Sequence, residues 1–141
     1  MKIILPLSAI IILTVISITV SGCHKPKPDC GCDSKTIKMI PDSASITGRI
    51  GYKKQIDPND NFYNNKFWLI YTDTTFCSVC RTSFILCNED ILPFGLKQLK
   101  NYPDSSIVVK YSGYIKELCQ KTFDIPEHNY YHITLTKIEK Q

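Results

Sequence analysis

Several features that would point to an activity are scarce or missing in this chain of 141 residues. It has 17 basic and 13 acidic residues, a formal net charge of +4, and no tract or stripe of Lys and Arg. A charge balance of this kind argues against electrostatic recognition of nucleic acid, so no nucleic-acid partner is expected. The six glycines form no phosphate-binding loop, and the chain has no internal repeat and no low-complexity tract.

The usual catalytic and metal-binding residue sets are also missing. The chain has only three histidines, and no Ser-His-Asp set can be singled out from their spacing. His132 is expected to face solvent, because in an extended strand it shares a face with Thr134 and Thr136. Residues 57–61 (Asp-Pro-Asn-Asp-Asn) are typical of a turn and lack the length and terminal glutamate of an EF-hand. The sequence therefore predicts no catalytic residue, metal ligand or cofactor here, and it favours a binding protein over an enzyme.

What the chain does contain is an apolar run over residues 3–20, preceded by the basic residue Lys2. The run ends in Val-Ser-Gly-Cys, and the cysteine of this motif is Cys23. An aliphatic residue, two small residues and a cysteine resemble the lipobox of bacterial lipoprotein signal peptides. The resemblance covers residues 1–23 and implies cleavage before Cys23 and attachment of lipid to it. A transmembrane anchor and a plain secretory signal are the alternatives, since about 18 apolar residues can span a bilayer.

The lipobox resemblance also implies a location and a division of the chain. Residues 1–22 would be the signal peptide, residues 23–42 a lipid-anchored tether, and residues 43–141 one domain. Residues 24–29 contain two prolines and no apolar side chain, which is typical of an extended linker. The expected location is the cell envelope, where a membrane-anchored lipoprotein, such as one of the outer membrane, would face the periplasm or the outside.

Five segments of the predicted domain have the character of β-strands. Residues 46–54 alternate between apolar and polar side chains with a period of two, which indicates a half-buried strand. Residues 66–72 are aromatic and aliphatic almost throughout, as in a central strand. The other three strands are expected at residues 83–87, 107–115 and 130–138, with a bulge at Gly113.

One helix is expected over residues 90–100, where Leu92, Leu96 and Leu99 fall on one face. The order of three strands, a helix and two strands resembles the OB-fold, a small five-stranded barrel. This resemblance is topological, and it implies that the three leucines close one end of the barrel. Another small barrel or a sandwich is the alternative fold.

Six cysteines remain besides Cys23: Cys30, Cys32, Cys77, Cys80, Cys87 and Cys119. Their even number and the oxidising compartment predict three disulfides, for which fifteen connectivities exist. The OB-like arrangement implies that Cys87 pairs with Cys119, because the ends of their strands could approach each other. Cys30 and Cys32 are too close together to pair easily with each other. They are therefore expected to pair with the two cysteines of residues 77–80.

The motif Cys77-Ser-Val-Cys80 also suggests two alternative functions. It follows a hydrophobic strand and so resembles thioredoxin-like oxidoreductases, in which a helix N-terminus lowers the pKa of the first thiol. Residues 82–87 are β-branched and aromatic rather than helix-forming, which favours a structural cysteine pair. In a further alternative, Cys30, Cys32 and this motif supply four thiolates to a zinc ion.

The resemblance to OB-fold barrels also points to a binding surface, because such barrels bind through strands two and three and the adjoining loops. Here the loop over residues 57–65 carries Phe62 and Tyr63, and the second strand carries Trp68. Trp68 is expected to be exposed, because it alternates with the inward-facing residues of its strand. We therefore expect a lipid-anchored binding module. Its partners would be the membrane, through Cys23, and a protein or carbohydrate ligand.

Overall fold

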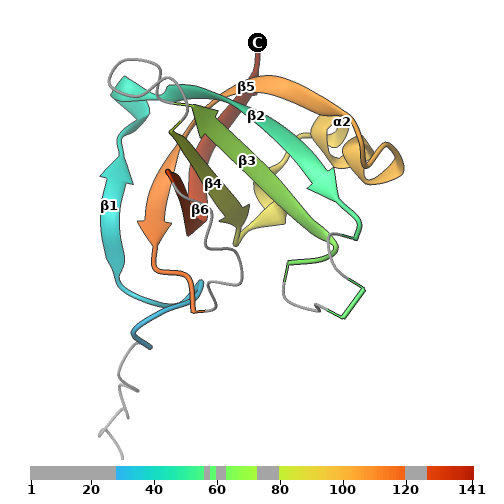
Figure 1. Ribbon diagram of the computed structural model, residues 1–141. Helices are drawn as coiled ribbons and strands as arrows, with labels where there is room; N and C mark the ends of the chain where they lie inside the picture. Colours follow the sequence, from blue (N-terminus) through green and yellow to red (C-terminus); the bar gives the residue numbers. More distant parts are fainter. Residues whose placement is uncertain (1–27, 56–57, 60–62, 73–79, 120–126) are drawn as a thin grey trace, which may run out of the picture.

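Five strands close into a barrel in the computed structural model, which describes residues 28–55, 58–59, 63–72, 80–119 and 127–141. Around the barrel the order is β2, β3, β4, β6 and β5, and β5 pairs with both β6 and β2, so the circle of strands is complete (Figure 1). A sixth strand, β1, extends the sheet beside β5. The strands are β1 (Thr36–Ile40), β2 (Ile46–Lys53), β3 (Lys66–Thr72), β4 (Arg81–Leu86), β5 (Ser106–Lys116) and β6 (His128–Lys140).

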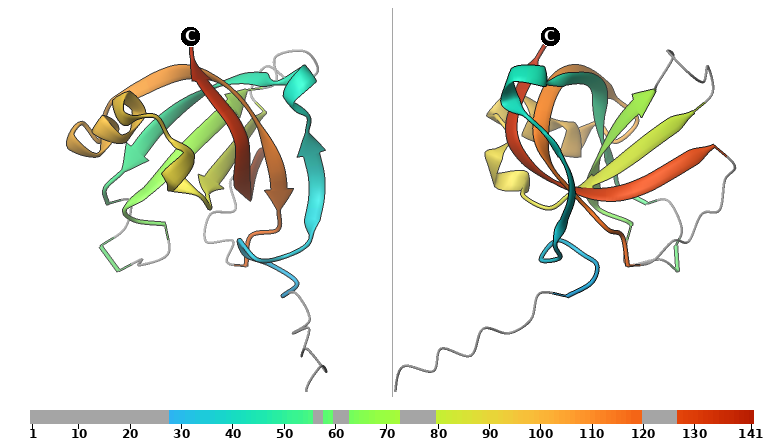
Figure 2. Two further views of the ribbon diagram at one scale, coloured as in Figure 1. Left: turned by 180° about the vertical axis from the view of Figure 1, so that it is seen from behind. Right: turned by 90° about the vertical axis from the view of Figure 1, so that its left-hand side faces the viewer.

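This order of strands is that of the OB-fold. Strands β4 and β6 pair in parallel, whereas the other pairs are antiparallel. The helical segment lies between β4 and β5, the third and fourth strands of the barrel, and packs beside it (Figure 2). The predicted OB-like barrel with one helix between strands three and four is thus confirmed. Each barrel strand begins and ends within two residues of its expected bounds.

The helical segment is less regular than the single helix expected over residues 90–100. It consists of a 3-10 turn η3 (Glu89–Ile91), the short helix α2 (Phe94–Lys97) and a second 3-10 turn η4 (Gln98–Asn101). Pro93 causes the break, because proline disfavours helical backbone in the residue before it, and Leu92 is extended. The three predicted leucines are nevertheless all buried in the core. Within the described ranges, no helix is long and apolar enough to cross a membrane.

Strand β1 lies where a tether was expected, within residues 23–42. It pairs with the second half of β5, while β2 pairs with the first half. This is possible because β5 is 11 residues long and can hold two partners on one edge. The sequence Thr-Ile-Lys-Met-Ile gives no clear sign of a buried strand, and Ile37 and Met39 are 53% and 54% exposed. Residues 36–40 are nevertheless part of the sheet.

The side chains divide into two apolar clusters, one on each side of the barrel wall. The inner cluster fills the barrel, and six of its members have no exposed surface: Ile50, Phe67, Leu69, Val109, Tyr111 and Ile133. The outer cluster is smaller and contains Tyr63, Trp68, Ile85 and Leu118, with Tyr130 packed against it. Side chains of the neighbouring loops and strand ends therefore cover part of the outer face of the sheet.

The bulge expected at Gly113 is present, because the register between β5 and β6 shifts between Ser112 and Gly113. A Cβ atom at Gly113 would lie 2.5 Å from the carbonyl oxygen of Thr134, a backbone atom that cannot rotate away. We predict that Gly113→Ala lowers the free energy of unfolding by about 2–3 kcal/mol, measured by urea denaturation.

Gly95 is the matched control for this substitution. A Cβ atom there would meet nothing within 4 Å, and the residue lies in helix α2. Gly95→Ala should therefore leave stability unchanged or raise it by up to about 1 kcal/mol. Equal effects of the two substitutions would show that the close approach of β5 and β6 at Gly113 is wrong.

Candidate functional site

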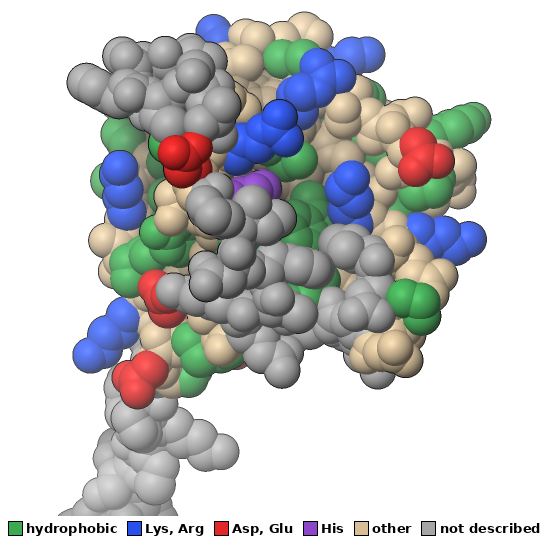
Figure 3. Space-filling model, in the orientation of Figure 1, with side chains coloured by type: hydrophobic (Ala, Val, Ile, Leu, Met, Phe, Trp, Pro, Cys, Tyr) green, Lys and Arg blue, Asp and Glu red, His purple; other side chains and the backbone are tan. Residues whose placement is uncertain are grey.

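A groove of about 590 Å³ runs over the outer face of the barrel. Trp68 and Ile70 on β3 and Ser83 on β4 form its floor. The flanking strands supply its sides, since β2 ends there and β6 begins there with His128 and Tyr130. On the face seen in Figure 1, a histidine is partly visible in a hollow, with Lys and Arg side chains above it and to its right (Figure 3). The groove thus lies on the face that OB-fold barrels use for ligands.

Trp68 lies in this groove but is only 5% exposed, so the exposed Trp68 expected from the sequence is wrong. The residue does point away from the barrel interior, as its alternation with Phe67 and Leu69 predicts. Tyr63 and Tyr130 cover it, with ring centroids 5.8 and 6.4 Å from the indole ring. The indole nitrogen also donates a hydrogen bond to the carbonyl oxygen of Tyr63, at 3.3 Å.

The other two candidate ligand-binding residues have different outcomes. Tyr63 is 1% exposed and belongs to the outer apolar cluster, so it supports Trp68 and offers no free ring to a ligand. Phe62 lies outside the described residues. The aromatic surface that a ligand can reach is therefore provided by Tyr130, which is only partly buried.

Ser83 and His128 form a polar centre in the groove that was not predicted from the sequence. The Ser83 hydroxyl oxygen and His128 Nε2 are 2.8 Å apart, and the imidazole stacks on Tyr130 with centroids 4.3 Å apart. Burial lowers the pKa of His128 below its usual value, and the positive charge of Arg81 lowers this pKa further. A neutral imidazole has one donor and one acceptor nitrogen, so the ring can hydrogen-bond to Ser83 and to a ligand.

Four exposed cations line this groove and the hollow that continues from it. Lys53 and Lys54 line the groove, whereas Arg49, Arg81 and again Lys53 line an adjoining hollow of about 290 Å³. Among the described lining residues of both, the one acidic side chain is Asp104. Lys53, Lys54 and Arg81 form no salt bridge within the described part of the chain. The groove therefore combines an apolar floor with a positively charged rim.

The disulfides differ from the predicted ones. Cys30 is bonded to Cys119, and Cys32 is bonded to Cys87, so the predicted Cys87–Cys119 bridge is wrong. The prediction did not include β1. This strand runs along β5 and so places the residues before it (28–35, the N-terminal segment) at the ends of β4 and β5. There the backbone nitrogen of Gly31 donates to the carbonyl oxygen of Glu117, at 2.8 Å.

The expected bridges from Cys30 and Cys32 to the Cys-x-x-Cys motif are wrong for the same reason. Cys80 is itself disulfide-bonded, to a partner beyond the described residues, and Cys77 lies outside them. The residue after Cys80 begins strand β4, so no helix N-terminus follows it to lower a thiol pKa. Three of the four cysteines of the zinc alternative are disulfide-bonded and thus provide no thiolate in this state.

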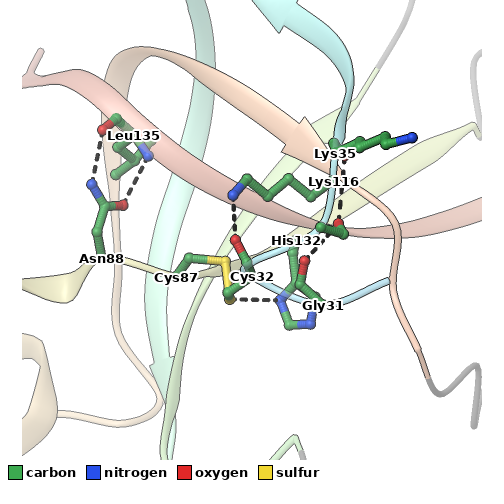
Figure 4. The surroundings of a disulfide bond; sticks show 9 residues. Gly31, Cys32, Lys35, Cys87, Asn88, Lys116, His132 and Leu135 are labelled. Carbon is green, nitrogen blue, oxygen red and sulfur yellow. Dashed lines mark hydrogen bonds between the residues drawn. A yellow bond between two sulfur atoms is a disulfide. The ribbon is translucent and has the colours of Figure 1, made fainter. Parts of the chain in front are cut away.

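His132 is 6% exposed, so the prediction that it faces solvent is wrong. Its Nδ1 atom lies 3.7 Å from the Sγ atom of Cys32, in the N-terminal segment that the disulfides hold against the barrel (Figure 4). Burial lowers the pKa of His132, more than a hydrogen bond with the backbone of Ile85 raises it. The strand pattern could not reveal this, because the covering segment is about 100 residues away in sequence.

A scan against protein families and a search of curated proteins both found no match for this chain. The groove and the N-terminal sequence pattern are therefore the two features of the chain that point to a function.

Proposed function

We propose that this protein is a lipid-anchored binding module of the cell envelope, and that its outer groove binds an acidic carbohydrate. The observation that carries the proposal is the groove itself, with its floor of Trp68 and Ile70 and its rim of exposed Lys and Arg. OB-fold barrels use this same face for oligosaccharides and oligonucleotides.

The lining residues favour a sugar that carries negative charge. Tyr130 presents a partly exposed ring, and aromatic rings pack well against the apolar faces of sugars. Ser83 and His128 offer hydrogen-bonding groups to hydroxyls. Lys53, Lys54 and the neighbouring arginines supply positive charge that attracts carboxylates. An acidic segment of another protein is the alternative ligand, and the experiment below distinguishes the two.

The N-terminal pattern supports the lipid anchor. Cys23 lies 30 − 23 = 7 residues before Cys30, which is bonded to the barrel domain through Cys119. An extended, proline-containing chain spans about 3 Å per residue, so this linker would span roughly 20 Å. It would hold the domain close to the bilayer, and the membrane would be a partner through the lipidated Cys23. This arrangement fits a location in the cell envelope.

We predict that Cys23→Ser prevents labelling by a fatty-acid analogue and leaves the precursor uncut, because this sulfur would carry the lipid. The measurement is labelling in cells followed by gel analysis of the mass. Cys77→Ser is the control and should be labelled and processed normally. Normal labelling of Cys23→Ser would contradict the lipoprotein proposal. An uncut and unlabelled wild-type chain would support the transmembrane alternative.

The groove can be tested through its own fluorescence, because Trp68 is the one tryptophan of the chain. We predict that polygalacturonate, a polymer of acidic sugar, changes this fluorescence saturably, whereas neutral dextran does not. The triple substitution of Lys53, Lys54 and Arg81 by Gln should weaken binding about tenfold, since each surface charge contributes up to about 1 kcal/mol.

The matched control removes the same charge elsewhere, by changing Lys35, Lys110 and Lys140 to Gln, which are exposed and lie outside the groove lining. This variant should bind polygalacturonate as the wild type does. Equal weakening in both variants would mean nonspecific attraction and would contradict the groove as the site. Binding of polyglutamate without binding of polygalacturonate would instead identify an acidic protein segment as the ligand.

A further inference from the structure

Three potential metal ligands from distant parts of the chain meet where the N-terminal segment lies against the barrel. They are Cys32, Cys87 directly after β4, and His132 on β6 (Figure 4). Their two sulfur atoms and one imidazole nitrogen all lie within 4.8 Å of one another. Cys32 and Cys87 form a disulfide, so the set offers no thiolate while that bond is intact.

The spacing of these atoms fits a tetrahedral ion once the disulfide is reduced. Zinc binds thiolate sulfur at about 2.3 Å and imidazole nitrogen at about 2.0 Å, which places such ligand atoms about 3.5 Å apart. His132 Nδ1 is 3.7 Å from Cys32 Sγ. The second sulfur would have to move to about 3.8 Å from the first, a distance that side-chain rotation can provide. The Cα atoms of Cys32 and Cys87 are 5.5 Å apart, so both side chains start from neighbouring points of the backbone.

The backbone around the set is held by contacts that do not involve the Cys32–Cys87 bond. Ser34 Oγ donates to the carbonyl oxygen of Gly31, and Lys116 Nζ donates to that of Cys32. Strand β1, which follows directly, is paired with β5 through its backbone, a contact that a reductant does not open. The N-terminal side of the set is therefore positioned independently of the bond that must open.

The other side of the set is fixed in the same way. The Asn88 side-chain amide exchanges two hydrogen bonds with the backbone of Leu135, each 2.8 Å long. The backbone nitrogen of Cys87 donates to the carbonyl oxygen of Ile133, at 2.9 Å. His132 also hydrogen-bonds with the backbone of Ile85, a second contact of the kind that orients histidine ligands in metal sites.

We propose that reduction of the Cys32–Cys87 disulfide creates a binding site for a divalent ion of the zinc class. A phosphine or dithiol reductant supplies two electrons, and two protons convert the disulfide to two thiols. Binding of the ion then releases two protons, because both sulfurs coordinate as thiolates. His132 is the third ligand and water the fourth, and the two thiolate charges balance the charge of the ion. The N-terminal segment is thus joined to the barrel by two disulfides under oxidising conditions and by a metal ion under reducing ones.

Cobalt(II) tests this site in the full chain in detergent, because it shares the tetrahedral preference of zinc and absorbs visible light. After treatment with a phosphine reductant, we expect one equivalent of Co²⁺ with thiolate-to-cobalt and tetrahedral d–d absorption, displaced by Zn²⁺. The oxidised chain should give no such signal. The variant Cys32→Ser/Cys87→Ser should lose the signal, and His132→Ala should bind at least about tenfold more weakly. The controls Cys77→Ser/Cys80→Ser and Cys30→Ser/Cys119→Ser, which remove the other cysteines that reduction converts to thiols, should keep it.

Each opposite result overturns the proposal. Equal binding by the oxidised and reduced chains, or binding retained by Cys32→Ser/Cys87→Ser, would exclude this site. Wild-type affinity of His132→Ala would exclude the histidine ligand, and loss of the signal in either control would assign the ion to the cysteines which that control lacks. Circular dichroism of the reduced chain completes the test. A sheet spectrum lost on reduction and not restored by metal would also contradict the proposal.

Discussion

The parallel pairing of β4 with β6 is the constraint on which the rest of this structure depends, because it closes the barrel. It joins strands about 47 residues apart, and its register sets Arg81 beside His128, Ser83 beside Tyr130 and Ile85 beside His132. The groove therefore lies at one end of this pair of strands. The Cys32, Cys87 and His132 cluster lies at the other end, where Cys87 follows β4. Both candidate sites are consequences of one strand pairing.

The N-terminal segment is the second structural element that depends on this closed barrel. Its disulfides join residues 89 and 55 positions apart, and such bonds each contribute about 2–5 kcal/mol in small exported domains. The same segment covers His132, and its continuation β1 takes the part of the β5 edge that β2 leaves free. A small domain with a modest core gains much of its stability from such cross-links.

The sequence predicted the local features well, because periodicity and composition determine them. The five barrel strands, the three buried leucines and the bulge at Gly113 all follow from patterns a few residues long. Apart from the break at Pro93 in the expected helix, the failures concern contacts between side chains that strand alternation does not specify. The disulfide partners and the burial of His132 depend on where β1 brings the N-terminal segment, and strand alternation alone does not determine this. Trp68 faces the groove as its alternation predicts, yet Tyr63 and Tyr130 cover it, a contact that alternation does not reveal. Ser83 and His128 come together through the parallel pairing of β4 with β6, which the pattern of either strand alone does not specify.

Two disulfides bond the N-terminal segment to the barrel at the end of the β4–β6 pair where Cys87 follows β4. Mass spectrometry of non-reduced peptides tests this most directly, provided that the peptide backbone is fragmented between Cys30 and Cys32 so that the two disulfides are separated. The account predicts one fragment joining Cys30 to Cys119 and another joining Cys32 to Cys87. A Cys87–Cys119 link, crossed pairs, or links from Cys30 and Cys32 to residues 77–80 would contradict it.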